Sequence, residues 1–357
     1  MKNLFRGVFS ILCLLAAAGS AQDVNVRRVT PHVTVLTMTN MGGYTNITVV
    51  EGRKGLTVIE TECTPYIASK IKEAAEKALG RDDWAYVINT HGHLHHAGGN
   101  AAFKNAQVIG PKAMRLDWLK DRLSTPEGRE QYCKDIGVRQ GLTRLRGLVA
   151  TDKPTPDPKR ELLRRIGFME EVEREILAGF EVVEPTITVD DRYALDLGDV
   201  HLEVIYWGDG IYHSSIFVHV VEDGLLVGMG MSGTWVPDFY GKLTLDGIRR
   251  AVGLMDEFRK EDRHIRLMIG VHGAGFTKSV EYFRPRQEYL ADLLDGLIQA
   301  QEQGLSLEQV KEAFSFDRRY ARFRKDFREP KNLEKVHQAN IEKIWKLIVE
   351  EQSAQDI

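Results

Sequence analysis

Four histidines lie within six residues of this sequence, at His91, His93, His95 and His96. Histidine is polar and only intermediate in its tendency to be buried, so core packing does not explain such a cluster. Zinc favours neutral imidazole nitrogens, and a catalytic zinc keeps one position open for water. In an extended or turning segment, alternate residues can direct two rings at one ion while another ring reaches a neighbouring ion. The cluster therefore predicts a metal site.

A short apolar run, residues 84–90, leads directly into these histidines and is predicted to be a buried strand. Residues 30–61 contain further predicted strands, because polar and apolar residues partly alternate there. Between them, Thr64-Pro65 supplies an N-cap and a first-turn proline for a helix that ends at Gly80. The later predicted strands lie at 107–109, within 186–206, and at 216–221, 225–227 and 266–271.

Two other parts of the chain are helical in pattern. Residues from about 112 to 184 are charged and are predicted to form a helical insertion. Its aromatic residues could line a substrate pocket, although we expect helix packing for Trp118, Tyr132 and Phe168. Beyond Phe283, apolar stripes predict helices that pack against the core. Along the chain, strands come first, and helices lie between and after them. This order predicts a layered α/β or α+β domain with a helical tail.

The first 21 residues are expected to be a secretory signal peptide. Lys2 and Arg6 form a positive start, residues 8–18 are apolar, and small residues follow as a cleavage site. The apolar stretch is too short for a membrane span, so we expect no integral span after cleavage. This predicts a periplasmic or secreted protein.

Composition narrows the class of protein further. With 357 residues, of which 43% are hydrophobic, the chain can bury a large core. A formal net charge of only −3, with no basic run, does not indicate a nucleic-acid binder. Two cysteines follow the signal peptide, Cys63 and Cys133. An exported pair can form one disulfide, but two cysteines are not a framework, so we expect a fold held by its core.

Residues 89–100 resemble the motif of the metallo-β-lactamase superfamily, in which His-x-His-x-Asp-His follows a strand, commonly after Asn-Thr and before Gly-Gly-Asn. This chain reads Asn-Thr-His-Gly-His-Leu-His-His-Ala-Gly-Gly-Asn there. The resemblance covers roughly residues 25–275. It implies a four-layer αββα sandwich over residues 22–275 that contains the helical insertion. A helical extension at 276–357 is similar to that of periplasmic members of the zinc-hydrolase branch.

The resemblance also implies metal ligands. His91 and His93 match the ligands of the first metal, and His96 matches the histidine of the second. His272, in Val-His-Gly near the end of the domain, matches the late ligand of the second metal.

A mid-chain ligand is expected as well, and two residues compete for the position. Alignment on the preceding strand favours Asp209, whereas alignment on the following strand favours His213. Alkylsulfatase-like members of the family use an acid at this point, which makes Asp209 credible.

The chain departs from the family pattern in its acidic residues. His95 replaces the motif aspartate, and an imidazole brings no negative charge to hold two neighbouring cations together. The usual bridging acid or cysteine after a strand is replaced by a segment with Met229 and Met231, which are expected to pack. Glu60 replaces an aspartate that supports the histidine loop as a hydrogen-bond acceptor.

These observations predict a secreted zinc hydrolase that acts on an ester, amide, lactam or related bond of a small molecule. His95, His96 or Asp209 could serve as general base, and a second ion on His95, His96 and His272 is expected to be weaker. The sequence therefore predicts one zinc ion or two. The alternative is a non-catalytic metal-binding relative with a degenerate dinuclear site. No oligomeric state is predicted.

Overall fold

The computed structural model describes residues 24–38, 45–151, 155, 157–209, 215–228, 236–237, 239, 243–272, 279–327 and 332–355. The expected signal peptide, His213, Met229 and Met231 lie outside these residues.

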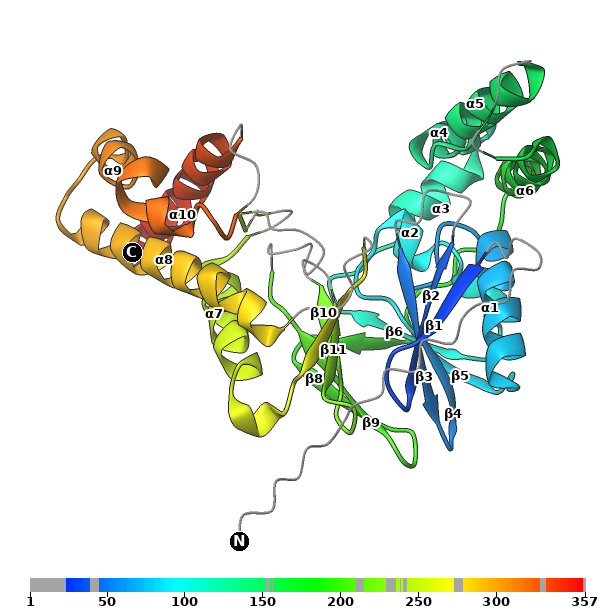
Figure 1. Cartoon of the computed structure of the whole chain (residues 1–357). Coiled ribbons are helices and arrows are strands. Elements are labelled where there is room, and N and C mark those ends of the chain that lie inside the picture. Colours follow the sequence, from blue (N-terminus) through cyan, green and yellow to red (C-terminus); the bar gives the residue numbers. More distant parts are fainter. Residues whose placement is uncertain are drawn as a thin grey trace, which may run out of the picture.

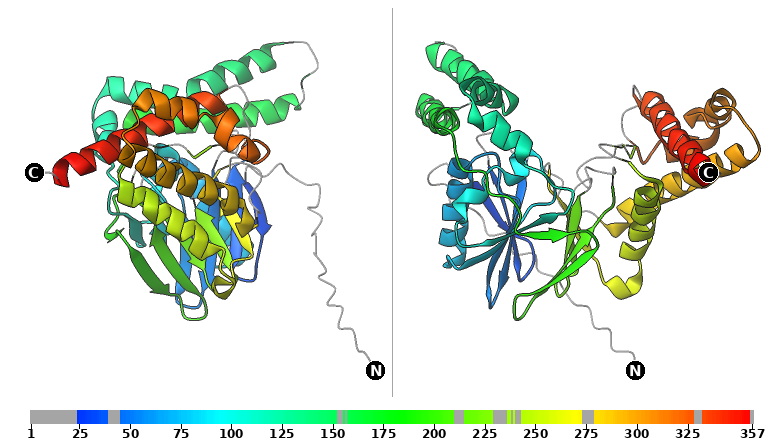
Figure 2. Two further views of the ribbon diagram at one scale, coloured as in Figure 1. Left: turned by 90° about the vertical axis from the view of Figure 1, so that its left-hand side faces the viewer. Right: turned by 180° about the vertical axis from the view of Figure 1, so that it is seen from behind.

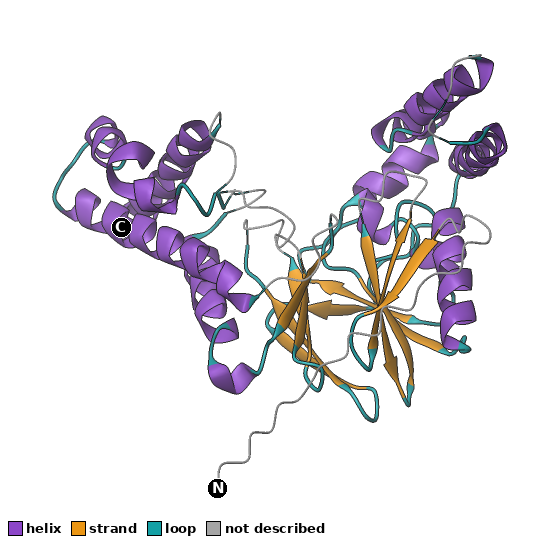
Figure 3. Cartoon of the chain, viewed as in Figure 1, coloured by secondary structure: helices purple, strands orange, loops and turns teal. Residues whose placement is uncertain are grey.

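Two β-sheets form the centre of the molecule (Figure 3). The first has seven strands in chain order: β1 (Val24–Arg28), β2 (Val33–Met38), β3 (Asn46–Gly52), β4 (Gly55–Ile59), β5 (Trp84–Ile88), β6 (Gln107–Pro111) and β7 (Ile187–Val189). The second has five strands, in the order β12 (Leu267–Gly270), β11 (Leu225–Gly228), β10 (Ile216–Val220), β9 (His201–Tyr206) and β8 (Arg192–Asp196). The first sheet is antiparallel from β1 to β4 and parallel from β4 to β7.

The strands are buried on both faces. Successive residues of a strand point in opposite directions and belong to different hydrophobic clusters. In β2, Val35 faces the cluster between the two sheets, and Leu36 faces the cluster under the outer helices. In β10, Val218 lies between the sheets, and Phe217 lies in the outer cluster of the second sheet. This period of two, with helices over both outer faces, produces the predicted four-layer αββα sandwich.

Helix α1 (Pro65–Leu79) packs on the outer face of the first sheet, where its buried side chains join the outer cluster. It begins and ends as the sequence predicts. Thr64 accepts a hydrogen bond from the amide of Ile67, and Gly80 at the C-cap has a φ of 67°. Helix α7 (Leu245–Phe258) covers the second sheet in the same way.

Four helices lie between β6 and β7 in the chain: α3 (Asp117–Ser124), α4 (Pro126–Asp135), α5 (Val138–Ala150) and α6 (Lys159–Ala178). The last part of the chain forms α8 (Arg284–Glu302), α9 (Leu307–Ala313) and α10 (Leu333–Gln355). Both helical groups extend beyond the end of the sheets at which α2 (Leu94–Ala97) lies (Figures 1 and 2).

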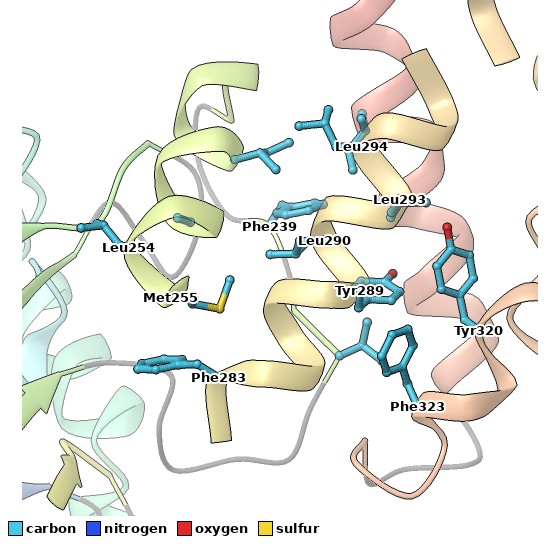
Figure 4. Packing of buried hydrophobic residues seen from close by; sticks show 14 of the residues in the cluster. Phe239, Leu254, Met255, Phe283, Tyr289, Leu290, Leu293, Leu294, Tyr320 and Phe323 are labelled. Atoms are coloured by element: carbon cyan, nitrogen blue, oxygen red, sulfur yellow. The ribbon is translucent and has the colours of Figure 1, made fainter. Parts of the chain in front are cut away.

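The C-terminal helices join the core through an apolar contact with α7. Met255 of α7 lies near Phe283 and Leu290, and Tyr289 on the other side of α8 packs against Tyr320 (Figure 4). None of the helices in the described part of the chain is long and apolar enough to span a membrane.

Two expectations about side chains can be compared with the structure. Tyr132 and Phe168 are buried in the outer cluster of the first sheet, which confirms helix packing, whereas Trp118 is 37% exposed. Cys63 and Cys133 are both buried free thiols, so they do not form the disulfide that an exported pair can form. The large core accounts for the fold without it.

Candidate metal centre

The four clustered histidines lie in the loop that follows β5 and in the short helix α2, which comes directly after this loop. His93 is the extended N-cap of α2, whereas His95 and His96 lie within the helix. This change from extended chain to helix turns the rings toward one another. The ring centroids of His91 and His96 lie 4.1 Å apart, and those of His95 and His96 lie 4.3 Å apart.

A buried polar network holds the histidine loop in place. The carbonyl oxygen of His96 accepts hydrogen bonds from the amide of Thr61 at 3.0 Å and from the side-chain amide of Asn89 at 2.8 Å. Asn100 joins the network because its Oδ1 accepts the Thr61 hydroxyl at 2.8 Å. The Asn residues that flank the motif are therefore structural supports of the loop.

The glycines of the motif permit this close packing. A Cβ atom on Gly99 would lie 2.0 Å from the carbonyl oxygen of Thr61, and one on Gly98 would lie 2.0 Å from that of Cys63. These are backbone atoms, so no side chain can rotate to make room.

Gly99→Ala is therefore expected to lower the free energy of unfolding by about 3 kcal/mol or more. Gly147→Ala is the matched control, because a Cβ on this residue of the last turn of α5 meets nothing within 4 Å. The control should be neutral or slightly stabilising, since alanine is the better helix former. Urea unfolding measures both variants, and equal free energies would contradict the steric account.

His272 reaches the loop from the second sheet. It follows β12 and forms an isolated antiparallel bridge with Thr45. Asn46 ties the sheets together at this edge, because its side-chain amide donates to the carbonyl of Gly270 at 2.7 Å and its backbone amide donates to that of Val271 at 2.8 Å. Residues nearly 180 positions apart in the sequence thus meet at one site.

Three imidazole nitrogens converge at this junction. Nε2 of His272 lies 3.1 Å from Nε2 of His96 and 3.4 Å from Nε2 of His95. Zinc–nitrogen bonds of about 2.0–2.1 Å in a tetrahedral arrangement separate two ligand nitrogens by about 3.3–3.4 Å. Both distances to His272 therefore fit ligands of a zinc-sized ion, and the three candidate ligand atoms lie within 4.8 Å of one another.

Protonation also suits metal binding. Burial, together with neighbouring histidines, lowers the pKa of His95 to about 3 and also lowers the pKa of His96 well below its usual range. Both rings are therefore neutral at pH 7, which is the form that binds a metal.

Glu60 supports the trio from behind, as the sequence predicts. Its Oε1 accepts the backbone amide of Thr90 at 3.1 Å, and its Oε2 lies 3.0 Å from Nδ1 of His96, at ion-pair distance but not aligned as a hydrogen bond. Burial raises the pKa of this fully buried carboxyl. A carboxylate behind one ring nitrogen orients the opposite nitrogen toward an ion.

The other predicted site residues differ in their surroundings. His91 is buried, and its Nδ1 lies 3.0 Å from the hydroxyl of Thr90; its ring lies 4.5 Å from that of His93. His91 also forms a second close group with Glu60 and His96. Asp209 follows β9 and accepts the hydroxyl hydrogen bond of Tyr206. Among the described residues, Asp209 belongs to neither close group of candidate ligands.

Sequence reasoning missed Glu62. This residue lines a cavity together with His95 and His272, and it is only 8% exposed. Burial raises the pKa of Glu62 to about 8, although hydrogen bonds from Cys63 and Thr45 oppose the shift. The sequence did contain one indication, a second glutamate two residues after Glu60 at the end of an apolar strand.

Comparisons with known proteins identify the family of this chain. The family model described as "Metallo-beta-lactamase superfamily" matches residues 40–228. No curated protein matches the chain. Among solved structures, the stereoselective inverting sec-alkylsulfatase Pisa1 from Pseudomonas sp. is 14% identical with a TM-score of 0.53, over 90% of this chain and 50% of that chain. This chain thus spans about half the length of that alkylsulfatase.

Two metallo-beta-lactamases are also similar in structure. The enzyme from Pontibacter korlensis is 13% identical with a TM-score of 0.45, over 75% of this chain and 99% of that chain. FIM-1 from Pseudomonas aeruginosa, in its mono-zinc form, is 15% identical with a TM-score of 0.43, over 76% of this chain and 97% of that chain.

Proposed function

Because this chain belongs to the metallo-beta-lactamase superfamily, we propose that it is an exported metal-dependent hydrolase whose zinc ion is held by His95, His96 and His272. The observation that carries the proposal is the convergence of three ring nitrogens at one junction, with Nε2 of His272 no more than 3.4 Å from Nε2 of either partner. When bound, such an ion acts as a Lewis acid and lowers the pKa of water to about 7.

The ligand set differs from the one that the sequence resemblance favours for the tighter ion. That resemblance gives His91 and His93 to the first metal, together with Asp209 or His213. The proposed site instead uses the residues expected to bind a weaker second ion. The distances among His95, His96 and His272 support this choice.

Proton transfer requires a group whose pKa lies near the working pH. The pKa of His95, at about 3, leaves this ring a weak base. Glu62 lines the same cavity as His95 and His272, and a bound cation would favour its ionised form, which can accept a proton. We therefore assign to Glu62 the proton-transfer role that the missing motif aspartate has in the family, and to His95 a place among the ligands.

A substrate of such an enzyme carries a carbonyl, ester or related centre beside His95 and His272. Thr45 stabilises this side of the site, because its hydroxyl donates to the carbonyl oxygen of His95 at 3.3 Å. Glu60 keeps the His96 ring oriented during the reaction. The second candidate function, metal binding without catalysis, is motivated by a ligand trio that contains no carboxylate.

Metal removal tests the proposal. The purified chain is expected to hold one zinc equivalent by elemental analysis and to hydrolyse at least one member of a panel of esters, lactones, thioesters, β-lactams and sulfate esters. Chelation should reduce turnover by at least about 100-fold, because the activated water is lost, and added zinc should restore it. Bound zinc with no turnover would favour the non-catalytic function, and turnover unaffected by chelation would refute metal dependence.

A further inference from the structure

A cavity of about 380 Å³ adjoins the metal centre. This volume lies in the lower part of the range of small-molecule pockets, about 300–1,000 Å³. His95 and His272, two of the three proposed ligands, form part of its wall. A molecule in the cavity therefore has one end at the reacting centre.

The rest of the described wall is mostly apolar. It is formed by side chains from β2, the segment before α1, α1, α2 and the end of α4, namely Met38, Cys63, Ile67, Leu94 and Ile136. The polar groups Thr45 and Glu62 belong to the segments that contact the metal centre.

Asp135 is the other acidic residue in the wall, and its carboxylate is already engaged. Its Oδ2 pairs with Arg122, and its Oδ1 accepts the side-chain amide of Gln131 at 2.8 Å. These partners hold the carboxylate on the side of the helical insertion, so it does not provide a free charge for a ligand in the cavity.

The helical insertion forms a fixed part of this wall. The buried hydroxyl of Tyr132 in α4 donates to the carbonyl oxygen of Cys63 at 2.7 Å. Glu175 of α6 accepts the backbone amide of Tyr66 at 2.9 Å, and the rings of Tyr66 and Phe168 lie 5.5 Å apart. The cavity is therefore already formed without a ligand, so binding does not require the insertion to move.

We propose that this cavity binds an apolar chain of the substrate, alkyl or acyl, whose attached ester or related group reaches His95 and His272. This assignment of substrate class rests on the proposed function, because it places the reacting group at the proposed metal ligands. Burial of the chain against Ile67, Leu94 and Ile136 provides the affinity.

Straight-chain alcohols test the inference separately from catalysis, because they have no bond to hydrolyse. Binding of 1-butanol, 1-hexanol and 1-octanol to the zinc-loaded protein is measured by calorimetry. Each added methylene should strengthen binding about 4-fold until the chain fills the cavity. Absence of hydrolysis on the substrate panel, with this binding intact, would refute the proposed function but not the cavity assignment.

Ile136→Asn places an amide in the wall and should weaken 1-hexanol binding by about 10-fold. Leu148→Asn is the matched control, because both residues are partly buried in the insertion and pack against the same cluster, but Leu148 does not line the cavity. The milder Ile136→Ala should give a smaller loss if the asparagine variant does not fold. Equal binding of all three alcohols, or equal effects of Ile136→Asn and Leu148→Asn in folded proteins, would overturn the inference.

Discussion

His96→Ala is expected to weaken zinc binding by more than about 100-fold, because removal of a group that merely orients a ligand already costs 10- to 100-fold. His96 occupies a central position: its Nε2 lies 3.1 Å from Nε2 of His272, and its Nδ1 lies 3.0 Å from Glu60. Hydrolysis should fall in parallel. Competition with a chromophoric chelator measures the affinity for zinc.

His201→Ala provides the control for this experiment. His201 lies on β9, is exposed, and pairs with Glu222. It contributes to no close group of candidate ligands in the described part of the chain. The control should retain wild-type zinc affinity. Equal affinities of the two variants would exclude His96 from the metal centre.

Glu62→Gln is expected to stabilise the metal-free protein at high pH. The pKa of Glu62 rises from 4.5 in the unfolded chain to about 8 in the folded protein. The folded wild type therefore binds more protons between these values, and it loses stability as the pH rises from about 4.5 to 8. The loss amounts to a few kcal/mol, at most about 5, and glutamine removes it.

The measurement compares wild type and variant by urea unfolding at pH 5 and pH 8.5 in the presence of a chelator. The chelator is needed because a nearby cation favours the ionised carboxylate. The variant's advantage should be small at pH 5 and large at pH 8.5. An advantage that is the same at both pH values would show that Glu62 does not titrate as a buried carboxyl.

The sequence was informative about the sandwich because its local patterns and its tertiary contacts agree. The sequence predicted strands within residues 30–61, and in β2 the neighbouring apolar residues Val35 and Leu36 are buried on opposite faces, since successive residues of a strand point to opposite sides. The Thr64 cap and Gly80 define the ends of α1 by local hydrogen bonding and backbone conformation alone. Such features depend on neighbouring residues, which a single sequence displays directly.

The site was less predictable because its contacts are not local. Nothing near Glu62 in the sequence shows that Ile136, more than seventy positions later, lies across the same cavity. The pairing of Nε2 atoms among His95, His96 and His272 similarly depends on how β3 and β12 meet. The motif resemblance supplied His272, but the mid-chain ligand, Asp209 or His213, stays a prediction.

Glu60 and Glu62 carry a further consequence. Both have left-handed backbone conformations, with φ of 72° and 68°, which glycine adopts at lower cost. Both are also buried carboxyls. Glu60 and Glu62 therefore each lower the stability of the fold in two ways, through backbone strain and through burial of a polar group. Strained backbone and buried charge of this kind cluster at functional sites, which agrees with the proposed function of this segment. If the proposed function holds, substitutions at Glu60 and Glu62 that raise thermal stability are therefore expected to lower activity.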